Sequence, residues 1–427
     1  MENITQLGTQ ITEQTHCPDI LIMSRIFKPQ GSVIGEYVYN RCLQDPDRII
    51  VITSGCSNDK NNDKNFEQPP EFPVYHCLNY NFPKNFLGGN LVSRLIKTCL
   101  KSSLKIFNII FSFLLAIKLY FRYHYRYIEW CHGYDFLALL LLSYILPIRF
   151  FIYLHGKDLT DIAKTPFWRS LFKLTLKRAE GIVCQNSYVR DKLRNTFRLD
   201  TPTHIINPVV RPDKFTHSSS TNYLQDLRTQ LRESYNISET AIVILSVGEL
   251  LPNKGFEQVI DNIPLLLTLG IDVHYIICGQ GHFETELKSQ CQRLRVDKRV
   301  HFAGYVSEKE LANYYAACDI FAILTLEEEI NQSIENLEIF HLEAEYFGKP
   351  IIASRLGSIL DIVHHEENGL LVNPESGYEV LQAFKKLCQD QQLREKLGRQ
   401  GQELAKRKTY HRWLYNPETS YSCIVSY

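Results

Sequence analysis

The sequence predicts an α/β protein with two successive domains, each built on a parallel sheet wrapped by helices. Short β runs alternate with helical patterns in the first half, the alternation stops after Asn207-Pro208, and it begins again at 241. The length points the same way, because 427 residues exceed what one ordinary hydrophobic core holds.

Each predicted domain has its own run of elements. In the first, we expect strands at 19–26, 48–53, 127–131, 149–154 and 181–185, and helices at 33–43, 136–146 and 167–178. In the second, we expect strands at 241–247, 273–278, 300–303, 320–324 and 350–354, and helices at 256–267, 284–294, 308–317, 339–347 and 379–397. The polar segment HSSSTN at 217–222 is the best linker candidate. The predicted boundaries are 1–215 for the first domain, 216–238 for the linker region, 239–405 for the second domain and 406–427 for the tail.

Composition and charge narrow the class of protein. Hydrophobic residues make up 44% and charged residues 22%, and the formal net charge is zero, which disfavours a nucleic-acid binder. Residues 1–200 carry 25 Lys+Arg against 17 Asp+Glu, so the remaining residues carry 22 against 30. A front half at +8 and a back half at −8 indicate two domains with different neighbours.

The cysteines and the first residues favour a cytoplasmic location. The twelve cysteines include no C-x-x-C pair and no zinc-type spacing, and the first ten residues are polar and lack the apolar run of an export signal. Scattered thiols of this kind are typical of a reducing compartment.

The longest apolar run, IFNIIFSFLLAI at 106–117, has basic flanks. At about twelve residues it is short of a bilayer span. It is interpreted either as a buried core helix or as a helix in the interface of an anionic membrane, contacting the bilayer through 94–126 on its inner face.

Three patterns in the second domain could hold an anion or a sugar. A strand ends in Gly248, and Lys254 stands just before the next helix, where backbone N–H groups and the helix dipole favour phosphate. Gly279 follows the next strand and permits a close backbone approach. Glu335 and Glu343 could offer carboxylates to sugar or ribose hydroxyls, although each pattern also fits an ordinary turn or a solvated acidic face.

Taken together and in order, these segments resemble glycosyltransferase family 4, the group 1 glycosyl transferases. The segments that match are VGELLPNKG, ICGQGHFETELK, VHFAGYVSEKELANYYAACDIFAIL, ENLEIFHLEAEYFGKPIIAS and ENGLLVNPES. In the first half, FKPQGSVIGEYV, IEWCHGYDF, YLHGKDL, CQNSYVRDKL and IINPVVRPDKF match more weakly. The resemblance implies a GT-B fold, in which two Rossmann-like domains face each other across a deep cleft.

The resemblance also implies roles for individual residues. Lys254 would contact the donor diphosphate, with Gly248 and Gly279 in the same donor site, and Gly31 would let a loop close on the diphosphate. Glu335 would lie near the transferred sugar and Glu343 would bond the ribose. His132 would stand beside the reacting centre, although it also fits a histidine satisfied by a neighbouring strand, and His155 would lie on the acceptor side.

The implied activity is that of a metal-independent, retaining hexosyltransferase. It would move sugar from a nucleoside-diphosphate sugar to a glycan or lipid-linked acceptor, in the synthesis of cell-surface polysaccharide or glycolipid. Asp45-Pro46-Asp47 precedes a strand, on the wrong side for a metal–diphosphate site, so no metal is expected.

The sequence departs from the family pattern at several positions, and these departures are compatible with functions other than glycosyl transfer. Glu249 stands where the family has arginine, Asn336-Leu337-Glu338 replaces glycines, and Asn416-Pro417 interrupts the last helix. The alternatives are a catalytically silent binding or assembly partner, and an epimerase or phosphorylase of the same fold.

Overall fold

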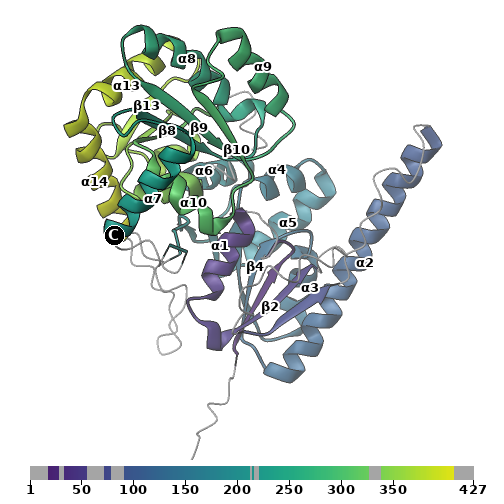
Figure 1. The fold of residues 1–427 in the computed structure, drawn as a ribbon. Helices are drawn as coiled ribbons and strands as arrows, with labels where there is room; N and C mark the ends of the chain where they lie inside the picture. The colour runs from purple at the N-terminus through teal and green to yellow at the C-terminus, as the bar shows by residue number, and fades with distance from the viewer. Residues whose placement is uncertain are drawn as a thin grey trace, which may run out of the picture. The chain divides into compact units, whose positions relative to one another are not determined.

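The computed structural model describes residues 18–27, 33–54, 72–77, 91–211, 214–215, 221–326 and 338–407; within these, the side chains of 33, 91–105, 157, 221 and 338 are not described. Contacts group the chain into two compact units (Figure 1). The first comprises 1–30 and 41–151, and the second comprises 31–40 and 152–427.

The first sheet has seven strands within the described ranges, in the order β3-β2-β1-β4-β5-β6-β7. Its strands are β1 Ile20–Ser24, β2 Ile49–Ser54, β3 Val74–Cys77, β4 Tyr127–His132, β5 Arg149–Leu154, β6 Gly181–Cys184 and β7 Thr203–Ile205. The central β1 is buried along its whole length and pairs in parallel with both β2 and β4. The continuous apolar run of such strands follows from burial on both faces.

The helices around this sheet include one of unusual length, α2, with 33 residues. They are α1 Val33–Cys42, α2 Leu91–Tyr123, α3 Phe136–Ile145, α4 Lys157–Ala163, α5 Pro166–Arg178 and α6 Ser187–Thr196. Asn186 caps α6 by accepting the backbone N–H of Val189 at 2.8 Å. The apolar run at 106–117 is therefore one part of a much longer helix than the sequence indicates.

The second sheet has six strands within the described ranges, in the order β10-β9-β8-β11-β12-β13. Its strands are β8 Ile242–Val247, β9 Val273–Cys278, β10 Val300–Gly304, β11 Ile320–Ile323, β12 Ile351–Ser354 and β13 Gly369–Val372. β8 pairs in parallel with β9 on one side and with β11 on the other. The strand order reverses at this point, and ligands of open α/β sheets bind outside the carboxyl ends of the strands at such a reversal.

The helices of the second sheet include those predicted, with one helix divided in two and one further helix, α7, that was not predicted. They are α7 Thr221–Ser234, α8 Phe256–Thr268, α9 Glu284–Leu294, α10 Glu308–Ala317, α12 Glu338–Tyr346, α13 Gly377–Gln389 and α14 Gln391–Arg407. The single helix predicted at 379–397 is wrong: two helices meet at Asp390, whose backbone is extended and whose carboxylate accepts the N–H of Leu393 at 2.9 Å. A residue that caps a new helix ends the previous one.

The predicted linker region, 216–238, contains α7. This helix packs against α10, and Arg228 and Arg232 both bond the carboxylate of Asp319. A helix with such buried polar contacts is part of the packed second unit, so this stretch does more than connect.

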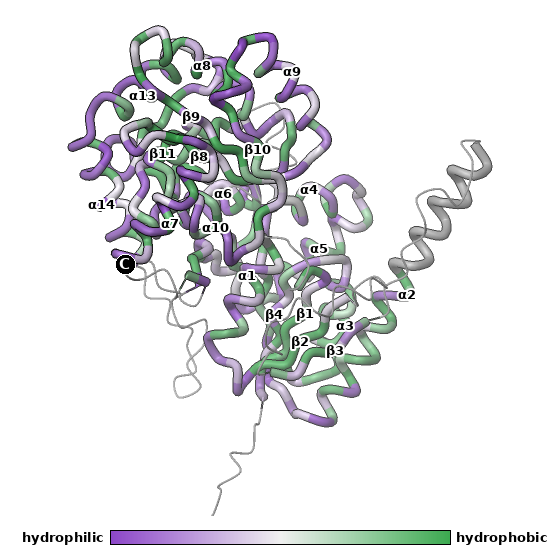
Figure 2. Tube along the Cα trace, viewed as in Figure 1, coloured by the Kyte–Doolittle hydropathy of each residue, from purple (hydrophilic) through white to green (hydrophobic). Residues whose placement is uncertain are grey.

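Hydrophobic residues gather along the strands of both sheets (Figure 2). Eight free cysteines are buried among the described residues: Cys42, Cys77, Cys131, Cys184, Cys278, Cys291, Cys318 and Cys388.

Candidate functional site

The carboxyl ends of β8 and β9 meet in a tight backbone contact. Gly248 donates its N–H to the carbonyl of Cys278 at 2.9 Å, and a Cβ at Gly279 would overlap the carbonyl oxygen of Gly248. Gly279 also has a φ of +147°. The close packing of the two strands therefore requires glycine at position 279. A Cβ at Gly248, by contrast, would only touch the rings of Phe256 and Phe340, about 4.0 Å away.

Lys254 lies at this edge on a short 3-10 turn, Pro252–Lys254, directly before α8. It is only 5% exposed, and burial lowers the pKa of its ammonium group to about 8, partly offset by the charge of Glu249. Gly255 makes the turn possible, because its φ is +74° and a Cβ there would overlap the carbonyl of Leu324. A buried cation beside a helix N-terminus suits an anionic ligand.

Glu249 is exposed beside this turn, and its carboxylate is close enough to Lys254 to raise the pKa of that lysine. A bound diphosphate would therefore meet one cation and one carboxylate here, where the family pattern has two cations.

Glu343 lies on α12, fully buried, and both of its carboxylate oxygens are bonded within the protein. Lys214 donates to one oxygen at 2.6 Å, and the hydroxyl of Tyr315 donates to the other at 2.9 Å. The carboxylate is not presented to solvent in this structure. Sequence reasoning missed Lys214 and Tyr315, because neither carries a local motif and Lys214 is 129 residues from its partner.

Two hydroxyls at the same edge were also missed. Thr325 follows β11 and Ser354 ends β12, and both are buried with a side-chain oxygen that has no hydrogen-bond partner among the described residues. Their place after adjacent strands of the sheet is the signal that could have found them.

Two predicted site residues, Gly31 and Glu335, lie outside the described residues. His132 ends β4 in the first unit, half-buried and in register with Ser24 of β1. It thus stands at the carboxyl end of its strand.

His155 follows β5 in the second unit and belongs to a buried polar cluster. Its Nδ1 lies 2.8 Å from Oε1 of Gln185, which follows β6, and the ring of Tyr37 packs edge-on at 5.3 Å. Burial raises the pKa of the nearby Asp158 to about 6, although the charge of His155 opposes the shift. Gln185 is a further residue that sequence reasoning missed, since it carries no motif of its own.

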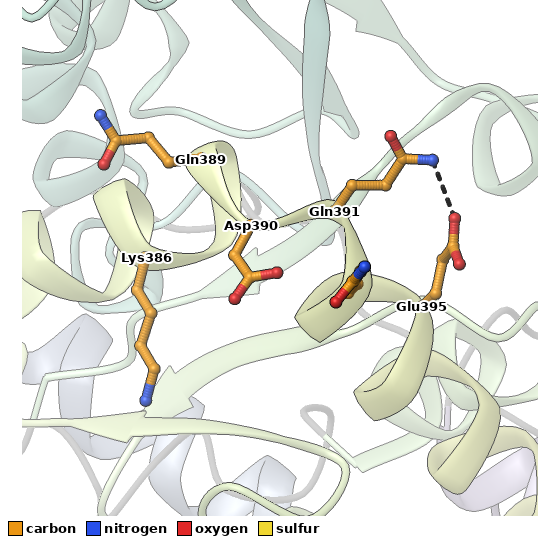
Figure 3. Close-up of a pocket in the computed structure, with 6 residues that line it drawn as sticks. Lys386, Gln389, Asp390, Gln391 and Glu395 are labelled. Atoms are coloured by element: carbon orange, nitrogen blue, oxygen red, sulfur yellow. Dashed lines mark hydrogen bonds between the residues drawn. The ribbon is translucent and has the colours of Figure 1, made fainter.

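A separate hollow lies where α13 meets α14 (Figure 3). Six exposed polar residues line it, and none of them is a predicted site residue: Lys386, Gln389, Asp390, Gln391, Gln392 and Glu395. Gln391 donates to Glu395 at 2.9 Å across its rim. Exposed polar side chains of this kind are typical of ordinary surface.

The described residues hold no group of three or more His, Cys, Asp or Glu side chains arranged to bind a metal ion.

Comparison with known proteins identifies the class. The two Rossmann-like domains have the GT-B fold of solved glycosyltransferases, as the sequence predicts. HepE of Anabaena in complex with UDP superposes with a TM-score of 0.67 at 19% identity, over 91% of this chain and 95% of that one. Sucrose-phosphate synthase of Thermosynechococcus elongatus gives 0.67 at 18%, over 91% and 94%.

The family follows from the second domain. Residues 228–404 match the family described as Glycosyl transferases group 1, which confirms the predicted resemblance for this part of the chain. A GDP-mannose-dependent alpha-(1-6)-phosphatidylinositol monomannoside mannosyltransferase of Mycobacterium tuberculosis is 26% identical over 58% of this chain and 63% of its own length. N-acetyl-alpha-D-glucosaminyl L-malate synthase of Bacillus anthracis is 22% identical over 58% and 61%. The alignments thus span less than two thirds of these relatives.

Proposed function

We propose that the protein is a glycosyltransferase that moves a sugar from a nucleoside-diphosphate sugar to a glycan or lipid-linked acceptor. The observation that carries the proposal is Lys254, a buried cation before α8 at the strand-order reversal of a group 1 domain. The relatives and neighbours support a nucleotide-linked donor, since one is named for GDP-mannose and another was solved with UDP.

In the proposed reaction, the second domain binds the donor. The oxygen of an acceptor hydroxyl bonds to the anomeric carbon as the bond between that carbon and the diphosphate breaks, and the hydroxyl proton leaves with the diphosphate. Lys254 and the backbone N–H groups at the start of α8 stabilise the charge that develops on the leaving diphosphate. Four finer parts of this proposal rest on the family resemblance. They are retention at the anomeric carbon, a metal-independent mechanism, a cytoplasmic location and a role in cell-surface polysaccharide or glycolipid synthesis.

The first test is differential scanning fluorimetry against UDP-, GDP- and ADP-sugars, with and without EDTA. We expect one nucleotide to raise the melting temperature selectively, and Lys254→Ala to abolish the rise. Lys298→Ala, an exposed lysine of the same domain, is the matched control and should keep the rise. Loss of the rise in EDTA would contradict the metal-independent mechanism.

Two observations favour a catalytically silent protein as the second candidate. Both carboxylate oxygens of Glu343 are bonded to Lys214 and Tyr315, and the negative charge of Glu249 acts on Lys254. The implied donor site is therefore less open and less cationic than the family pattern. A flat nucleotide panel from a cooperatively folded protein would support this candidate over the enzyme.

A further inference from the structure

The described part of α2 is apolar on the side that faces away from the protein as well as on the side that faces it. Its inner side is buried and consists of Ile109, Ser112, Ala116 and Leu119. Its outer side carries large exposed side chains: Ile106 at 54%, Phe107 at 45%, Ile110 at 51%, Leu114 at 58% and Phe121 at 70%. A surface helix of a soluble protein has polar residues on its outer side. An exposed apolar side of this size is typical of a surface that binds a protein or a membrane.

The neighbouring helix extends the apolar surface. α3 packs against α2, and its exposed residues include Leu141, Tyr144 and Ile145. Figure 2 shows mainly hydrophobic residues along α3 and along the described part of α2. We call the exposed residues of both helices the α2–α3 face: Ile106, Phe107, Ile110, Leu114 and Phe121 with Leu141, Tyr144 and Ile145.

The two chain segments that form this face carry charges of one sign. The sequence has no Asp or Glu from 72 to 128 or from 136 to 157. Lys118, Arg122, Arg126 and Arg149 are exposed, and the N–H of Arg149 donates to the carbonyl of Arg126 at 3.0 Å, which places these two arginines side by side. Cations next to exposed apolar side chains complement an anionic, partly apolar partner.

The inner contacts show that α2 stays with its domain. By length and composition, Ile106–Tyr123 could cross a membrane. However, the guanidinium of Arg25 donates to the carbonyl of Asn108 at 3.1 Å and to the hydroxyl of Ser112 at 3.0 Å, and the hydroxyl of Tyr125 donates to the carbonyl of Ala116 at 2.9 Å. Spanning would strip these bonds and carry Lys118 and Arg122 into hydrocarbon, whereas lying in the interface keeps both.

We propose that the α2–α3 face docks on the surface of an anionic lipid bilayer, with α2 lying in the plane of the headgroups. The outer side chains enter the boundary of the acyl chains, and Lys118, Arg122, Arg126 and Arg149 contact the anionic headgroups. The proposal does not depend on glycosyl transfer, because its readout is partition onto vesicles.

The test is co-sedimentation of the full chain with vesicles of phosphatidylcholine alone and with about one-third phosphatidylglycerol. We expect binding to the anionic vesicles and little to the neutral ones. The triple variant Ile110→Gln/Leu114→Gln/Phe121→Gln should lower the partition coefficient more than about tenfold. Replacing Lys118, Arg122 and Arg126 with glutamine should remove the preference for anionic vesicles.

The matched control is Leu265→Gln/Leu269→Gln/Tyr378→Gln, which removes equally exposed apolar side chains from the second unit. It should bind like the parent, and melting curves confirm that each variant is folded. Failure of the parent to bind anionic vesicles, or an equal loss in the control, would overturn the proposal. So would a parent that is dimeric by light scattering and becomes monomeric in the face variant, because the face would then belong to a second copy.

Discussion

At the scale of single residues, Lys254 combines a positive charge with almost complete burial. Burial disfavours the ammonium form and lowers the lysine pKa to about 8, so the group titrates near physiological pH. A bound diphosphate favours the charged form, which links donor affinity to the protonation of this one side chain.

Donor affinity should therefore fall as the pH rises through about 8. At about one pH unit above the pKa, roughly nine-tenths of the ammonium groups are deprotonated, and the dissociation constant should rise up to about tenfold. Calorimetric titration at neutral and alkaline pH measures the change. Lys254→Arg should flatten the profile, since arginine stays charged, and an unchanged parent profile would contradict the assignment.

Gly255 and Gly270 allow backbone strain to be separated from steric overlap. Their φ values are +74° and +77°, but a Cβ at Gly255 would overlap the carbonyl of Leu324, while a Cβ at Gly270 would meet nothing within 4 Å. We expect Gly270→Ala to lower the free energy of unfolding by about 1 kcal/mol. Gly255→Ala should lower it by at least about 2 kcal/mol more, measured by urea denaturation; equal losses would show that the turn is not held against β11.

Lys214 and Glu343 form a buried ion pair, with side chains 8% and 0% exposed. Although burial opposes the charge of Lys214, the carboxylates of Glu343, Glu308 and Glu36 raise the pKa of this lysine overall. Lys214→Met should cost about 3–5 kcal/mol, because Glu343 is left charged without its cation. Adding Glu343→Leu should recover part of the loss in a double-mutant cycle, and strictly additive losses would contradict the pairing.

At the scale of elements, the carboxylate of Asp319 links α7 to the second sheet. Arg232 is fully buried, donates to Asp319 at 2.6 Å, and also donates to the carbonyls of Ala317, Ser238 and Ala241. Asp319 in turn accepts the N–H of Val243 at the start of β8. The carboxylate thus joins the helix, β8 and the end of α10.

Asp319→Ala should destabilise the protein by about 3–5 kcal/mol, because it leaves a buried guanidinium unpaired. The matched control is Asp272→Ala, which breaks the exposed pair with Arg299 and should cost under about 1 kcal/mol. Urea denaturation followed by far-UV circular dichroism measures both, and equal losses would contradict the attachment.

At this scale, the elements predicted best from the sequence are those with a distinct run or repeat of apolar residues. Buried central strands such as β1 and β8 were found to within a residue or two, because both of their faces are covered. The missed strands β3, β7 and β13 are all at sheet edges. β3 and β7 are short and only partly buried, so their sequences lack a distinct apolar run.

The candidate site divides in the same way. Gly248, Lys254 and Gly279 were found because each follows a predicted strand or precedes a predicted helix, and the structure brings them to one edge. The partners of Glu343 come from the segment after the first sheet and from α10, and only the folded chain brings them together. A family resemblance assigns roles to single residues such as Glu343, but it does not show which side chains neutralise their charge.

At the scale of the whole molecule, the zero net charge conceals an excess of cations in the first half that coincides with the α2–α3 face. Added salt should separate the two proposed binding events. Raising ionic strength from about 0.05 M to about 0.5 M should weaken vesicle binding strongly, because the exposed cations are screened. The thermal shift from the donor should change less, because Lys254 is buried, and an equal loss of both would contradict this division.

The buried cysteines can report where the folded chain opens, because a thiol reacts with an alkylating reagent only when it is exposed. Burial raises the pKa of seven of these thiols, to about 11 for Cys291 and about 12 for Cys184, so they resist alkylation while the chain is folded; the seven are Cys42, Cys77, Cys184, Cys278, Cys291, Cys318 and Cys388. Cys42, Cys77 and Cys131 lie in the first unit and Cys278, Cys318 and Cys388 in the second. Brief alkylation during a urea titration, read by peptide mass spectrometry, would therefore record the opening of each unit separately without any introduced label.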